Sequence, residues 1–277
     1  MLARTISAAL RAILVGMVVA LPALMATGMP ADKMQIVALV SLIAAVFTFV
    51  EYNSRSPSLV EFREAPPFNR IRFIALAVTV FLLTVISGVN GQPTTLMILI
   101  DAVGQRLGQA IDFPYSPVRL IVLMLPEGTD PRFVAEVRTA AGIAYTTSII
   151  ALGAFVLHLR MSPWPARGSA FNLWTNLPTF EPTARGDVVN RLQRDASINL
   201  VLGFLLPFLI PAVVKLASDI FNPIHLNDPL TLIWTMTTWA FLPASLLMRG
   251  IALGRVAQMI EEQRRRVVGG ESQLASA

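Results

Sequence analysis

The chain has 277 residues, of which 14% are charged and 55% are apolar, and its mean hydropathy is +0.64. Because soluble domains carry about 25% charged residues, a soluble globular fold is nearly excluded. The net charge is +5, and the absence of cysteine excludes disulfides, iron–sulfur clusters and thiolate metal sites.

Six windows are long and apolar enough to cross a bilayer, whose hydrocarbon core of about 30 Å requires roughly 20 helical residues. Backbone polar groups in hydrocarbon must be satisfied within the segment, so these spans are expected to be helices. The predicted fold class is therefore all-α, a polytopic membrane helix bundle with six transmembrane helices. The spans are residues 8–29, 34–52, 73–89, 133–159, 196–218 and 230–257, within a transmembrane domain of residues 1–260.

The first apolar window follows Arg4 and Arg11, an arrangement also typical of a signal peptide. Leu24 and Ala26 make a poor cleavage site, and we interpret the segment as a retained helix. Lysine and arginine indicate the orientation: an N-in, C-in topology puts 16 of them on the cytoplasmic side and 5 on the opposite side. The basicity is mainly a topology signal, and we expect a multi-pass protein of the bacterial cytoplasmic (inner) membrane.

The first cytoplasmic loop, residues 53–72, is charge-balanced and contains a Pro66–Pro67 pair. One interpretation is a connector packed on lipid headgroups. The other is a docking surface for a cytoplasmic partner, because exposed phenylalanines are costly in water. The second loop, residues 160–194, interleaves prolines with aromatic residues, which are expected at headgroup level. The candidate docking residues of the first loop are Phe62, Arg63, Phe68 and Arg70.

The periplasmic insert, residues 90–132, begins with an apolar stripe at helical spacing. The stripe predicts an amphipathic helix of about 17 residues, too polar to span, lying in the outer interface or across the mouth of the bundle. The VRLIVLML run after it is compatible with a strand, a buried segment or a re-entrant turn, so residues 96–125 are either interfacial or re-entrant. The stripe consists of Leu96, Leu99, Ile100, Val103, Leu107, Ala110 and Ile111.

Ionisable residues inside spans are candidate functional groups. Glu136 and Arg138 occupy the opening turns of the fourth span, and Lys215 lies near the end of the fifth. A shared periplasmic cluster of these three would be an entrance for an ion or a substrate. Alternatively, Lys215 extends to the periplasmic interface and meets the negative end of the helix dipole.

Three prolines inside the fifth and sixth spans, Pro207, Pro211 and Pro243, predict kinks. Each proline lacks a backbone donor and frees the carbonyl four residues earlier. Transporters use such broken helices to expose backbone groups to substrates. No acidic residue lies at the midpoint of a predicted span, however, and no internal repeat is evident, which disfavours proton-coupled or repeat-built transport.

Two histidines are present. His158 follows Ala154 by four residues, a spacing also seen at pigment-binding histidines, but its border position favours an ordinary interfacial histidine. His225, with Asp219 and Asp228, forms either a tight loop or a weak cation site, and the loop is preferred. The sequence contains no nucleotide-binding loop, zinc-protease motif or nucleophile elbow. We therefore expect no cofactor, no metal and no nucleic acid ligand.

Three functions are weighed. The first is a non-enzymatic inner-membrane protein that assembles with, anchors or scaffolds a larger membrane complex, because catalytic groups are lacking. The second is a small transporter or channel that uses the kinked fifth and sixth spans, and the third is a membrane enzyme. The expected partners are the lipid bilayer and other membrane-protein subunits or a second copy of the chain. Residues 261–277 are expected to form a cytoplasmic tail that contacts anionic lipid, disordered from Gly269.

Overall fold

The computed structural model describes residues 2–26, 29–87, 94–162, 164–165, 171–181, 186–218 and 226–275, with side chains to residue 266. All regular structure in these residues is α-helical, and six of the helices are long and apolar enough to span a membrane. The predicted polytopic helical bundle is thus confirmed. The helices are α1 (Leu2–Met25), α2 (Ala31–Asn53), α3 (Phe68–Ile86), α4 (Thr95–Ile111), α5 (Pro117–Met124), α6 (Pro131–Met161), α7 (Leu173–Asn176), α8 (Val188–Ser218) and α9 (Pro229–Ala275).

Helix boundaries differ from the predicted spans where polar turns extend a helix beyond the apolar window. α3 begins at Phe68 rather than at residue 73, and α8 begins at Val188 rather than at residue 196. Most of the VRLIVLML run, for which three structures were considered, belongs to the eight-residue helix α5, whose first turn is capped by the Ser116 hydroxyl. α9 continues through Ala275, where the sequence predicted a disordered end.

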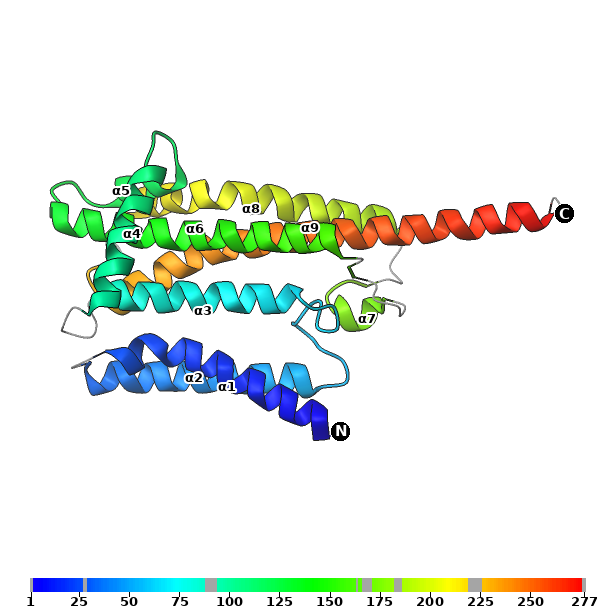
Figure 1. Ribbon diagram of the computed structural model, residues 1–277, viewed down its shortest axis with the longest axis horizontal. Helices are drawn as coiled ribbons and strands as arrows, with labels where there is room; N and C mark the ends of the chain where they lie inside the picture. Colours follow the sequence, from blue (N-terminus) through cyan, green and yellow to red (C-terminus); the bar gives the residue numbers. More distant parts are fainter. Residues whose placement is uncertain are drawn as a thin grey trace.

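The long helices run roughly parallel, and both chain termini lie at one end of the bundle, called here the termini end (Figure 1). α4 crosses the opposite end, called the distal end, and packs on α6 and α3. α8 and α9 form the most extensive helix pair, and α6 contacts α3, α4, α5 and α9. The amphipathic helix predicted from the apolar stripe is therefore present as α4, lying across the end of the bundle.

The α1–α2 hairpin is attached to one side of this bundle (Figure 1). α1 packs on α2, on α3 and, over a small area, on α9, whereas α2 packs on α1 alone among the helices that the structure describes. Gly16 allows this pairing, because a Cβ there would lie 3.3 Å from Ala45, and its carbonyl accepts a hydrogen bond from Ser41. Glu51 is the one buried residue of α2. The face of α2 that points away from α1 is therefore available to lipid or to another protein.

Candidate functional site

The two loops at the termini end form one aromatic core. Phe62 and Phe68 are 1% and 0% exposed, and their ring centroids lie 4.6 Å apart. Trp164 of the second loop packs 5.5 Å from Phe62 and donates its indole N–H to the Ala65 carbonyl at 3.1 Å. Phe155 of α6 closes the cluster. A docking role for the two phenylalanines required exposed rings, so this part of the prediction is wrong: the second loop covers them.

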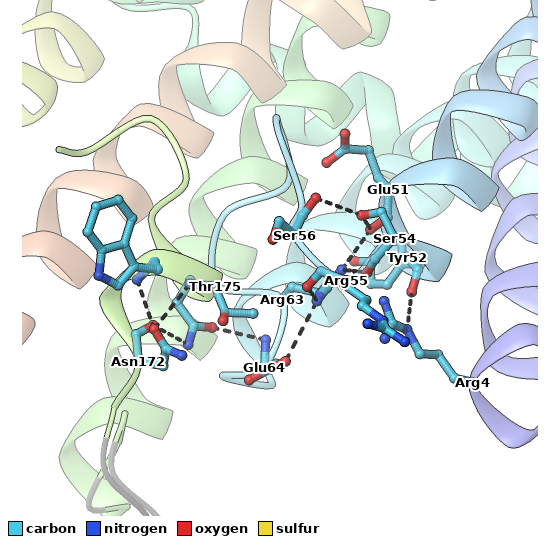
Figure 2. Close-up of polar contacts among 12 residues, drawn as sticks. Arg4, Glu51, Tyr52, Ser54, Arg55, Ser56, Arg63, Glu64, Asn172 and Thr175 are labelled. Carbon is cyan, nitrogen blue, oxygen red and sulfur yellow. Dashed lines mark hydrogen bonds and ion pairs between the residues drawn. The ribbon is translucent and has the colours of Figure 1, made fainter. Parts of the chain in front are cut away.

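The first loop is fixed at its start by a buried carboxylate. Glu51 accepts hydrogen bonds from the backbone N–H groups of residues 58–60, at 2.9 to 3.0 Å, and from the Ser58 hydroxyl. Arg63, predicted to face a partner, instead donates to the Glu51 and Ser54 carbonyls at 2.9 and 2.8 Å (Figure 2). Arg70 is exposed, and it alone of the four docking candidates keeps the accessibility that the prediction required.

Helix α7 attaches the second loop to the first. The Asn176 carbonyl accepts from Phe62 N–H at 2.6 Å, and its side-chain oxygen accepts from Glu64 N–H at 3.0 Å. Asn172 caps α7 by accepting from the backbone N–H groups of Trp174 and Thr175 (Figure 2). The two loops are consequently a single folded layer rather than separate connectors.

One carboxylate connects this layer to α9. Glu61 accepts two hydrogen bonds from Arg249, at 2.6 and 2.8 Å, and one from the Thr179 hydroxyl at 2.9 Å. Such bidentate arginine–carboxylate pairs fix geometry as well as charge. Next to this layer, an apolar groove of 320 Å³ lies between the second loop and α9 and is lined by Phe171, Leu173, Val188, Met259, Ile260, Gln263 and Arg264.

The three residues of the predicted entrance cluster have separate surroundings. Arg138 pairs with Asp112 at 2.7 Å, and the same carboxylate pairs with Arg119 at 2.9 Å. Lys215 lies on α8, which packs on α9 and α5. Glu136 faces a different space, a pocket between α4 and α6. Among the contacts of the described residues, none joins Glu136, Arg138 and Lys215.

The pocket beside Glu136 has a volume of 340 Å³ and lies at the distal end, between α4, the end of α3 and the first turns of α6. Asp101 and Gln105 enter it from α4, with the Gln105 amide donating to the Asp101 carboxylate at 2.9 Å. Arg132 and Thr139 of α6 supply further polar groups. The apolar part of the lining consists of Ile86, Met97, Ile98 and Ala135.

The proline-bearing segments of α8 and α9 pack tightly against each other. Pro211 frees the Pro207 carbonyl, and this carbonyl accepts a hydrogen bond from the Trp239 indole N–H at 3.1 Å. At Gly203, a Cβ would lie 2.8 Å from the Pro243 carbonyl, so the two backbones touch. The pocket beside Pro207 and Pro243 measures only 90 Å³ and has a mainly apolar lining, with hydroxyls from Tyr145 and Ser148.

The surroundings of His158 do not indicate a ligand. The His158 imidazole lies 3.0 Å from the Ser162 hydroxyl, one turn later at the end of α6, which fits the interfacial interpretation. His225 and Asp219 are outside the described residues, so the cation site suggested for them is not described. Asp228 instead pairs with Lys33 at 2.5 Å. Within the described residues, no group of three or more histidine, cysteine or acidic side chains is placed to hold a metal.

Sequence reasoning missed three acidic residues that organise the structure: Glu51, Glu61 and Asp112. Each lies at the end of a helix or in a loop, where a carboxylate normally indicates only a solvated surface. For Asp112 the sequence did contain a signal: it directly follows the amphipathic helix and has no basic residue at helical spacing, which indicates a partner from another segment. Comparisons with protein families, with curated proteins and with solved structures found no significant match to this chain.

Proposed function

We propose that this protein is a non-enzymatic subunit of the bacterial inner membrane that assembles with, anchors or scaffolds a larger membrane complex. The observation that carries the proposal is the α1–α2 hairpin. α2 buries only Glu51 and packs on α1 alone among the described helices, yet its end at the loop layer is fixed by the Glu51 hydrogen bonds. A helix that is fixed at one end and whose face away from α1 is exposed is suited to pack against a membrane helix of another protein.

The exposed face of α2 is apolar and includes Leu39 and Leu42. The small residues Ser41 and Ala45 instead face α1, where short side chains let the two backbones approach closely. The termini end adds a second surface: the apolar groove of 320 Å³ lies where α9 leaves the loop layer. We propose that membrane partners contact α2 and that a cytoplasmic segment of the complex contacts this groove.

The transporter alternative has one observation in its favour, the open pocket with charged side chains at the distal end. The proline-bearing helices α8 and α9 favour it less. The Pro207 carbonyl, which a substrate would need, is occupied by Trp239, and the pocket beside the prolines is small and mainly apolar. Flux of a labelled ion or amine across proteoliposomes containing the purified protein would favour transport over scaffolding.

The scaffold proposal is tested by purifying the protein from its native membrane in mild detergent and measuring the mass and stoichiometry of the complex. Two bulky substitutions serve as a matched pair: Leu42→Trp on α2, where the side chain is 61% exposed, and Val201→Trp on α8, where it is 56% exposed. Lipid accommodates either tryptophan. We expect only Leu42→Trp to release the partner.

Two results would overturn the scaffold proposal. One is a wild-type protein that runs as a lone monomer without a stoichiometric partner. The other is a complex whose stability is the same in the Leu42→Trp and Val201→Trp variants, because α2 would then not contribute to the interface.

A further inference from the structure

The distal pocket is built from three helices that meet where α4 crosses the bundle. The crossing is a backbone contact: a Cβ on Gly142 of α6 would lie 2.6 Å from the Gly108 Cα of α4. The ion pairs of Asp112 with Arg119 and Arg138 fix the far end of α4. The 340 Å³ pocket lies on the other side of this crossing, toward the start of α4. Its walls are therefore held by packing that does not depend on a ligand.

The charges in the pocket are mixed. Asp101 of α4 and Glu136 of α6 place two carboxylates on its lining, and Arg132 adds a guanidinium one helical turn before Glu136. None of the ion pairs in the described part of the chain involves Glu136 or Arg132. Two facing carboxylates attract a cation, and a neighbouring guanidinium attracts an anionic group next to that cation.

The pocket also lies at the depth of lipid headgroups. α6 has 31 residues, hence a length of about 46 Å, against about 30 Å for the hydrocarbon core. With His158 and Arg160 at the opposite interface, the hydrocarbon begins about 20 residues earlier, near Ala140. Arg132, Glu136 and Thr139 are then outside the hydrocarbon, while Met97 and Ile98 offer an apolar wall beside them.

We propose that this pocket binds the headgroup of a zwitterionic phospholipid that carries a primary ammonium, such as phosphatidylethanolamine. The ammonium donates hydrogen bonds to Asp101 and Glu136, the phosphate contacts Arg132, and an acyl chain lies along Met97 and Ile98. A quaternary ammonium fits less well, because it has no N–H to donate and is held by aromatic rings, which the lining lacks. The proposal does not depend on the scaffold function.

The test is native mass spectrometry of the detergent-purified full chain with equal amounts of phosphatidylethanolamine and phosphatidylcholine that have the same acyl chains. We expect wild type to bind the ethanolamine lipid about tenfold more tightly than the choline lipid, because one charge-assisted hydrogen bond accounts for a difference of about that size. Glu136→Gln and Asp101→Asn should each bring the ratio close to one. Glu127→Gln removes the same charge from an exposed position at the distal end that does not line the pocket, and should keep the preference.

Two further measurements make the outcome decisive. Ala135→Trp fills the pocket without changing its charge and should also abolish the preference, so a poorly folded Glu136→Gln variant does not prevent the test. Millimolar phosphoethanolamine, the free headgroup, should fail to displace the lipid. If the free headgroup bound as well as the lipid, the ligand of the pocket would be a soluble zwitterion and the lipid proposal would be wrong. A wild-type protein without preference, or a preference that survives in Ala135→Trp, would overturn the proposal.

Discussion

The sharpest test of the fold is a single methyl group at the crossing of α4 and α6. In Gly142→Ala, the new Cβ would lie 2.6 Å from the Gly108 Cα and 2.8 Å from its backbone nitrogen, where carbon atoms normally stay 3.5 to 4.0 Å apart. The obstructing atoms belong to backbone and cannot rotate away, so the helices must separate by about 1 Å. Overpacking of this kind costs about 1 to 3 kcal/mol.

The matched control is Gly153→Ala in the same helix, where a Cβ would have no atom within 4 Å. Thermal unfolding of both variants in the same detergent, followed by the fluorescence of the four tryptophans, separates local packing from helix propensity. We expect Gly142→Ala to unfold about 2 to 10 °C lower than wild type, and Gly153→Ala to match or exceed wild type. Equal melting temperatures for the two variants would show that α4 does not cross α6 at Gly142.

Three other predictions concern polar contacts. Glu61→Gln leaves its half-buried arginine partner on α9 without a counter-charge and should lower the free energy of unfolding in detergent by about 3 kcal/mol. The control Glu64→Gln changes a side chain that is 58% exposed and should lower it by less than about 1 kcal/mol. The pKa of Asp228 is lowered by its lysine partner on α2, so the ion pair stabilises the fold above the ordinary pKa of 3.8, and this stabilisation is lost as the pH falls through the lowered pKa. Between pH 7 and pH 3 the melting temperature should therefore depend less on pH in Asp228→Asn than in wild type. The same pH dependence in both proteins would contradict the ion pair. Trp239→Phe should lower the free energy of unfolding by about 1 kcal/mol in wild type, because the Pro207 carbonyl loses its indole donor. The loss should be small in a Pro211→Ala background, where a backbone N–H can again bond to that carbonyl. Additive effects of the two substitutions in a double-mutant cycle would refute the Trp239–Pro207 hydrogen bond.

The helices were predictable because hydrocarbon imposes both length and apolarity on a span. Helical periodicity predicted α4, whose polar residues repeat out of phase with its apolar stripe. Boundaries were less accurate: Asn69 and Arg72 are polar, so the apolar window excluded the first turn of α3 although the backbone is already helical there. The orientation of the bundle in the membrane remains a prediction from the distribution of arginine and lysine.

The site residues were harder to predict, because their partners are far away in sequence. Phe62 was expected to be exposed in a loop, and only the position of Trp164, about a hundred residues later, shows why it is buried. Arg138 was grouped with the nearby Glu136, yet its partner is Asp112, beyond the turn between α4 and α5. The sequence of a loop has no periodicity from which the neighbours of a residue such as Phe62 can be predicted. Charge alone does not show which of several carboxylates will pair with an arginine such as Arg138.

The α1–α2 hairpin has a consequence for how the chain is made. Its two helices contact each other over a much larger area than either contacts the rest of the bundle, and both precede α9 in the chain. Membrane helices that are each stable across the bilayer associate in a second stage. The hairpin therefore has its own tertiary contacts before Asp228 and Arg249, the partners of Lys33 and Glu61, have been synthesised. Its attachment to the bundle is completed only after α9 has entered the membrane.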